Sequence, residues 1–222
     1  MNITLGVYDL FAYAAPGSLY LALVIYVADR LSWIDPLRLL QSNTAVVIIS
    51  GAILSYLLGH ITYRLGYMLS RAYGHDKSLD DAVHEFVERV PTAKGRPFLQ
   101  ANRAIIQAAV ELHDIGAAAE IGRLRAVGLM LRNAAPVFVL GIITEFADAL
   151  TGAHLIAAVC CIAIFPLMAI GCLYQSAIMR HWANMKTFEL AYWIPDIDHE
   201  RYSKPHVIEK KKSARAASNA SW

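Results

Sequence analysis

Four long stretches with almost no charged residues constrain this chain more than any other feature. They are Leu10–Ala28, Thr44 up to Arg64, about Ala126–Thr144 with the single Arg132 near its start, and His154–Gln175 within a longer uncharged run. A bilayer core about 30 Å thick needs roughly 20 mostly apolar helical residues. Backbone polar groups in lipid must be satisfied within each segment, which favours helices over strands. The sequence therefore predicts an all-α integral membrane protein with four spans.

The overall composition excludes several other classes of protein. Of the 222 residues, 57% are hydrophobic and 17% are charged, whereas soluble domains average about 45–50% and 25%. The net charge of +2 does not favour a nucleic-acid partner. Residues 1–9 contain no Lys or Arg, so we expect the first span to be retained rather than cleaved as a signal peptide. Pro16 and Gly17 are expected to break this span near its start.

The positions of the basic residues predict an orientation in the membrane. Residues 71–125 hold eight Lys and Arg, the tail from residue 180 holds eight, and the turn at 145–153 holds none. Basic loops face the cytoplasm. We therefore expect a bacterial inner-membrane protein with both termini cytoplasmic, and four segments: a first helix pair (1–70), a cytoplasmic helical segment (71–125), a second helix pair (126–179) and a cytoplasmic tail (180–222), disordered from about 209.

The middle segment is predicted to form a cytoplasmic helical hairpin that extends a four-helix bundle. Ser78 is the expected N-cap of its first helix, and Pro91 should end that helix. A second helix is expected to start near Pro97 and to continue, with a bend near Gly116 or Gly122, into the third span. In the tail, residues 180–195 are expected to form a helix packed on the membrane or on the middle segment.

Polar residues near the lipid are the first candidates for a functional site, because ionisable groups there are costly and usually face an interior or water. A polar vestibule on the cytoplasmic side would be lined by the candidates His60, Tyr63, Arg64, Arg132 and Asn133, with Tyr67 on the same helical face as the first three. The alternative is that the arginines reach the headgroups by snorkelling. Glu145 and Asp148 are the candidate outer mouth.

A ridge of small residues marks the second span. Gly51, Ser55 and Gly59 recur at four-residue spacing, which lets helices approach closely. The ridge predicts tight helix packing, either within the chain or between subunits.

Conventional catalytic and metal motifs give little support for an enzyme. Three His-acid pairs (His75-Asp76, His84-Glu85 and His113-Asp114) suit a divalent metal only in a compact cluster, and we interpret them as surface residues. Cys160, Cys161 and Cys172 lie inside the fourth span and are interpreted as small apolar residues. An Arg-x4-His spacing at Arg201 and His206 falls in a polar tail. We expect no catalytic residues, no cofactor and no metal.

Several short motifs resemble an uncharacterised group of bacterial four-helix membrane proteins with a helical cytoplasmic insert. These motifs are Asp9-Leu10-Phe11, Ala15-Pro16-Gly17, Gly59-His60, Asn102-Arg103-Ala104 and Arg132-Asn133. Small proteins of this build are common as membrane effectors or sensors in antiviral defence operons, so the resemblance implies such a role by analogy.

The function expected from the sequence is that of a signal-responsive membrane sensor, channel or effector. Its expected partners are the lipid bilayer, further copies of the chain in a homo-oligomer, and a cytoplasmic protein that delivers the signal; nucleic acid is not expected. Two alternatives stay open, a membrane-bound metal-dependent enzyme using the cytoplasmic His and Asp residues, and an accessory subunit of a larger membrane complex.

Overall fold

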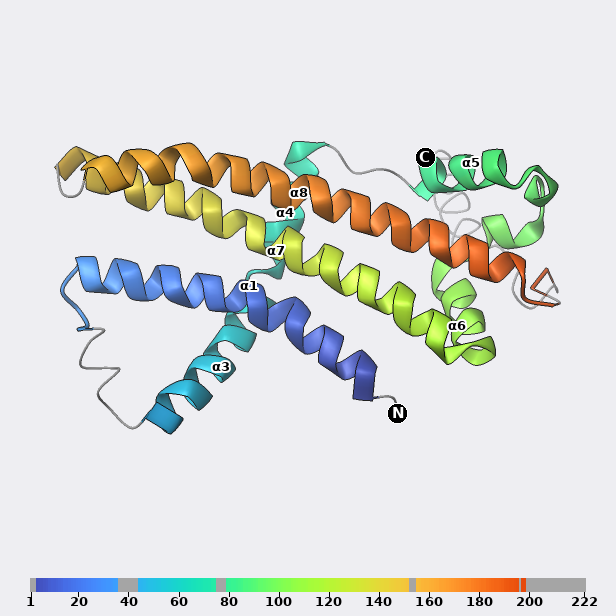
Figure 1. Cartoon of the computed structure of the whole chain (residues 1–222), viewed down its shortest axis with the longest axis horizontal. Helices are drawn as coiled ribbons and strands as arrows, with labels where there is room; N and C mark the ends of the chain where they lie inside the picture. The colour runs from blue at the N-terminus through green and yellow to red at the C-terminus, as the bar shows by residue number, and fades with distance from the viewer. Residues whose placement is uncertain (1–2, 36–43, 75–78, 152–154, 196, 199–222) are drawn as a thin grey trace, which may run out of the picture. The chain divides into compact units, whose positions relative to one another are not determined.

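The computed structural model describes residues 3–35, 44–74, 79–151, 155–195 and 197–198, and this part of the chain is helical with no strand. The elements are α1 (Ile3–Arg30), α3 (Thr44–Ile61), α4 (Tyr63–Tyr73), α5 (Leu79–Arg89), η1 (Pro91–Ala93), η2 (Pro97–Gln100), α6 (Arg103–His113), α7 (Ile115–Thr151) and α8 (Leu155–Tyr192) (Figure 1). The all-α prediction is confirmed for these residues.

Four of the helices, α1, α3, α7 and α8, are long and apolar enough to cross a membrane. They overlap the four predicted spans, although α3 ends at Ile61, short of Arg64. By length and composition they indicate a multi-pass membrane protein. The 37 residues of α7 and the 38 of α8 extend for about 55 Å each at a rise of 1.5 Å per residue. Both helices are therefore far longer than the hydrocarbon core.

The predicted break at Pro16 and Gly17 is wrong. Helix α1 continues through Pro16 to Arg30, and its ribbon changes direction part-way along (Figure 1). Proline removes one backbone hydrogen bond and commonly kinks a helix without ending it. Gly17 does not form a turn; it is buried inside α1, where the backbone of α3 passes beside it.

The described residues divide into two compact units, and α7 and α8 contribute to both. The membrane unit comprises residues 1–78 and 122–183, and the core unit comprises residues 79–121 and 184–222. Each of the two helices passes from one unit to the other without an interruption.

The core unit is built around a hydrophobic core of aromatic and aliphatic side chains. Phe86 of α5 lies at its centre, with ring centroids 6.0 Å from Phe188 and 6.4 Å from Phe98. The other buried members include Ile106, Val110, Ile121, Met185 and Ile197. The described residues from 184 to 198 therefore pack on the middle segment, one of the two positions that the sequence left open.

The helix boundaries of the core unit differ in part from the prediction. Helix α5 ends just before Pro91, as expected, whereas Ser78 lies outside the described residues. Pro97 starts only the short 3-10 helix η2, and α6 begins at Arg103, where the Asn102 side chain accepts a hydrogen bond from the Ala104 amide.

The expected continuation into the third span breaks at Asp114, not at Gly116 or Gly122. Asp114 has extended backbone angles, and its side chain accepts a hydrogen bond from the Ala117 amide at 3.0 Å. This aspartate caps the start of α7, because a short carboxylate satisfies an amide that would otherwise lack a partner. Helix α7 then continues through both glycines without a break.

The end of the described chain is held against the middle segment by polar contacts. The Arg96 guanidinium forms an ion pair with Asp198 at 2.5 Å, and Asp198 also accepts a hydrogen bond from the Phe98 amide. The Thr92 and Tyr192 hydroxyls lie 2.8 Å apart. The Arg201–His206 spacing and the expected disorder from residue 209 lie outside the described residues.

Candidate functional site

Thr62 lies between two helices, so the residues expected to line the vestibule are divided between them. Helix α3 ends at Ile61 and α4 begins at Tyr63. The buried Thr62 hydroxyl donates a hydrogen bond to the Leu58 carbonyl at 2.7 Å. His60 therefore lies on α3, whereas Tyr63 and Arg64 lie on α4, and the single helical face expected from the sequence does not form.

Helix α4 lies against α7 through its smallest residues. Only Gly66 and Ser70 of α4 are buried. A Cβ atom on Gly66 would lie 2.8 Å from both the Arg132 carbonyl oxygen and the Asn133 Oδ1 atom, closer than real Cβ contacts allow. The Arg180 guanidinium of α8 lies 3.4 Å from the Ser70 hydroxyl. The two helix backbones therefore meet at a point that tolerates glycine alone.

Arg132 is buried within the membrane unit, with 8% of its surface exposed. Its guanidinium carbon lies 4.9 Å from the centre of the Tyr63 ring and 5.9 Å from that of Tyr67. An arginine at these distances is attracted by the negative face of an aromatic ring. The structure thus places Arg132 under the tyrosines of α4.

Asn133 is fully buried beside Arg132. Its relative exposure is 0%, and neither amide atom has a hydrogen-bond partner within the described residues. A buried polar group left without a partner costs about 1–3 kcal/mol. By contrast, the buried Ser176 hydroxyl of α8 donates to the Gly128 carbonyl of α7 at 2.7 Å. No hydrogen bond among the described residues therefore offsets the free-energy cost of burying the Asn133 amide.

His60 belongs to an aromatic cluster that joins α1 and α3. Its ring stacks on Tyr13 at 3.8 Å between centroids and meets Tyr56 edge-on at 4.7 Å. Tyr13 also lies 6.5 Å from Tyr63. The cluster thus connects His60 to Arg132 through tyrosines rather than through a polar cavity.

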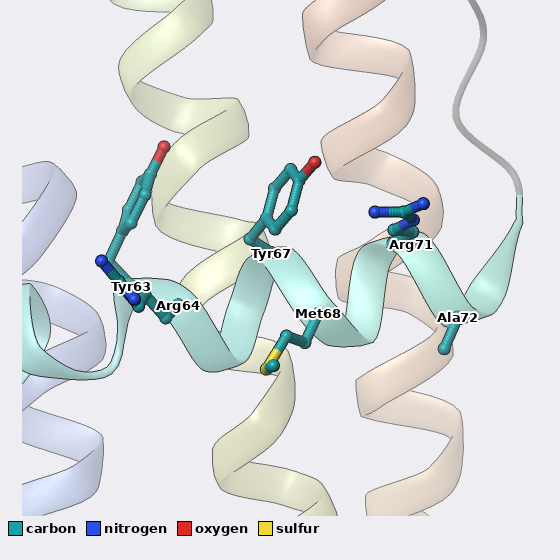
Figure 2. A pocket seen from close by; sticks show the side chains of 6 residues that line it. All are labelled: Tyr63, Arg64, Tyr67, Met68, Arg71 and Ala72. Atoms are coloured by element: carbon teal, nitrogen blue, oxygen red, sulfur yellow. The ribbon is translucent and has the colours of Figure 1, made fainter. Parts of the chain in front are cut away.

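Arg64 lies apart from these contacts, on the exposed side of α4. It lines an open groove of about 730 Å³ together with Tyr63, Tyr67, Met68, Arg71 and Ala72. Figure 2 shows Tyr63, Tyr67 and Arg71 projecting from one side of α4, and Met68 and Ala72 from the other. The groove has a polar aromatic wall and an apolar wall.

The two acidic residues of the expected outer mouth have different surroundings. Asp148 forms an ion pair with Arg30 at 3.1 Å and accepts a hydrogen bond from the Tyr26 hydroxyl at 2.6 Å. These contacts join the ends of α1 and α7. Glu145 is half-buried one turn earlier on α7. Asp148 therefore links the two helices, whereas Glu145 forms no ion pair within the described residues.

The small-residue ridge of α3 lies at the crossing with α1. A Cβ atom on Gly59 would collide with the Tyr13 carbonyl oxygen, and one on Gly17 would collide with the Ser55 carbonyl oxygen. Gly51, farther along, would meet only the Leu21 side chain, at 4.0 Å. Within the described residues the ridge contacts another helix of the same chain.

No protein-family model, curated protein or solved structure matches this chain. The candidate site is therefore interpreted from its own residues.

The His-acid pairs and the cysteines form no metal cluster within the described residues. His84 of α5 lies 3.4 Å from Glu88 on the exposed face of the helix, and His113 is exposed. Cys160, Cys161 and Cys172 are free thiols on α8, and His75 lies outside the described residues.

Sequence reasoning missed the residues that hold the site together. Tyr13 and Tyr56 pack on His60, Gly17 and Gly66 permit close helix contact, and Ser70 lies beside Arg180. The spacing of Gly59, Gly66 and Ser70 at seven and four residues was an available signal. This spacing was not recognised because α3 ends before Thr62. Gly59 therefore faces α1, whereas Gly66 faces α7.

Proposed function

We propose that this protein is a non-enzymatic, signal-responsive protein of the bacterial inner membrane that works as a homo-oligomer. The four spans form a four-helix bundle, and residues 79–121 form a cytoplasmic hairpin, with both termini on the same side. The core unit receives a ligand or partner protein, and the spans change their arrangement in response, either as a channel or as an effector. The resemblance noted above makes antiviral defence the first setting in which to look for the signal.

The buried amide of Asn133 carries this proposal. A polar group that lacks a partner in one arrangement favours any other arrangement that supplies one. Asn133 lies directly under Gly66 of α4, so a shift of α4 would change its surroundings. Helix α7, on which Asn133 lies, begins in the core unit. A signal at the core unit thus has a continuous helix along which to act.

The proposal is tested with two charge-preserving variants on α7. In Arg132→Lys the planar guanidinium that stacks under Tyr63 is lost, whereas Arg123→Lys changes an exposed residue of the same helix. The readouts are ion flux from reconstituted vesicles and growth on overexpression. We expect Arg132→Lys to reduce activity about tenfold, which corresponds to about 1.4 kcal/mol, and Arg123→Lys to stay near wild type.

Two outcomes would contradict the proposal. One is equal activity of wild type and Arg132→Lys when both insert and fold. The other is a wild-type protein that changes neither flux nor growth at any expression level, including during phage infection. An accessory subunit would give this second result, and it would also purify as one copy per complex rather than as a homo-oligomer. No contact among the described residues favours the metal-dependent enzyme.

A further inference from the structure

The groove on α4 carries two cations, Arg64 and Arg71. Arg64 and Arg71 are both exposed and both line the groove. Residues 44–74 contain no Asp or Glu. In the described part of the chain neither side chain forms an ion pair, in contrast to Arg30, Arg89 and Arg96. Within the described residues, no ion pair therefore balances the positive charge of the groove.

The position of α4 along the chain places this charge beside lipid. The second candidate span ends at Ile61, and α4 starts two residues later. A helix that follows a span at once begins at the level of the headgroups. Tyr63 and Tyr67 suit this depth, since tyrosine prefers the boundary between hydrocarbon and water.

The two sides of the groove match the two parts of a phospholipid. Guanidinium groups bind phosphate through paired hydrogen bonds, and seven helical residues separate Arg64 from Arg71 by about 10 Å along the axis. Met68 and Ala72, which project away from the side of α4 that carries Arg71 (Figure 2), offer apolar surface to an acyl chain. A soluble phosphate would use only the first of these features.

We propose that the α4 groove binds an anionic phospholipid, with Arg64 and Arg71 on its phosphate and Met68 and Ala72 against an acyl chain. Basic sites next to spans bind anionic headgroups in this way, at about 1 kcal/mol per arginine. The site goes beyond the proposed signalling function and does not depend on it, because lipid binding is measured without any activity.

The test measures lipid retained by the full-length protein. Wild type and Arg64→Gln/Arg71→Gln are purified in detergent, mixed with phosphatidylglycerol or phosphatidylcholine, and examined by native mass spectrometry. Arg89→Gln/Lys94→Gln is the matched control, since it removes two charges from the core unit. We expect the α4 variant to lose phosphatidylglycerol affinity roughly 30-fold, the control to stay within about twofold, and phosphatidylcholine binding to be weak throughout.

A third variant and a competitor distinguish the remaining explanations. Arg64→Lys/Arg71→Lys keeps the charge without the planar fork and should retain an intermediate affinity. Circular dichroism of each variant verifies that helix content is unchanged. Equal phosphatidylglycerol binding by wild type and the glutamine variant would overturn the proposal. Displacement of the lipid by millimolar glycerol phosphate would also overturn it, because the site would then prefer a soluble phosphate.

Discussion

The membrane unit and the core unit differ in the side chains that they bury, although the core unit also buries the polar residues Asn184 and Thr187. In the core unit Phe86, Phe98 and Phe188 are the largest of the fully buried side chains, and charged residues lie on the exposed faces of α5. In the membrane unit, the buried polar and charged residues are Ser55, Thr62, Ser70, Arg132, Asn133, Ser176 and His181, whereas many Ile and Leu side chains are exposed. This difference is the one expected if the core unit lies in water and the membrane unit lies in lipid.

This contrast teaches where each unit obtains its stability. The core unit gains free energy by removing apolar surface from water, as a soluble domain does. The membrane unit cannot gain free energy in this way, because lipid is as apolar as leucine. It depends instead on close backbone approach at Gly17, Gly59 and Gly66, and on polar contacts between helices such as Ser176 to Gly128.

The largest expected effect lies in the core of the core unit. Phe86→Ala should destabilise residues 79–121 by about 3–5 kcal/mol, since it removes a buried ring and leaves a cavity. Ile143→Ala, at a position of α7 that is 62% exposed, is the matched truncation in the membrane unit and should change stability by less than about 1 kcal/mol. Hydrogen exchange measured by mass spectrometry checks both. Equal losses of stability in the two variants would contradict the difference proposed between the two units.

The next effect tests backbone approach in the membrane unit. Gly17→Leu should lower the unfolding free energy by about 1–3 kcal/mol or more, because its side chain collides with the Ser55 backbone. Gly171→Leu is the control, since a Cβ atom there meets nothing within 4 Å. Thermal unfolding in detergent measures both. A Gly17 variant as stable as the Gly171 variant would show that α1 and α3 do not meet in this way.

The positions of the spans could be predicted from the sequence because length and apolar composition are local properties. The end of α5 before Pro91 was predictable for the same reason, since proline acts on its own turn. The continuation of α1 through Pro16 was not, because the outcome depends on contacts with Ser55 and Gly59 of another helix. The break at Asp114 was not predicted, because the sequence analysis considered only the two glycines that follow it as bend positions.

The sequence predicted some residues of the candidate site but not the contacts that they make. Arg132 and Asn133 were identified as polar residues in an apolar span, and the structure buries both. What surrounds them was not predictable, because the turn at Thr62 brings Tyr63 and Tyr67 over Arg132 and leaves His60 against Tyr13. The vestibule itself stays a prediction.

A smaller effect tests how α4 is held on the membrane unit. Tyr63→Leu should weaken docking of α4 by about 0.5–2 kcal/mol, because Arg132 loses one of its two aromatic partners. Tyr63→Phe keeps a ring in place and should behave like wild type. Protection of α4 against hydrogen exchange reports the difference. Equal protection in the two variants would mean that the ring does not stabilise the buried arginine.

The smallest effect concerns the link between α1 and α7. Asp148→Asn removes the ion pair with Arg30 but can keep a hydrogen bond to Tyr26. Both charged side chains are partly exposed, so the expected loss is below about 1 kcal/mol. A thermal unfolding curve measured at low and at high salt should show a small shift at low salt only. A large shift of the unfolding temperature at both salt concentrations would contradict this, because it would mean that the ion pair is shielded from solvent.

Two leucines of similar exposure test the central contrast most directly. Leu112 of α6 is 85% exposed and Leu167 of α8 is 71% exposed, yet the account places the first in water and the second in lipid. Each is replaced by Cys in a variant that lacks Cys160, Cys161 and Cys172, and open membranes are treated with a water-soluble maleimide. The account predicts rapid labelling at position 112 and almost none at position 167 until the membrane is dissolved and the protein unfolded. Equal labelling at both positions in intact bilayers would contradict it.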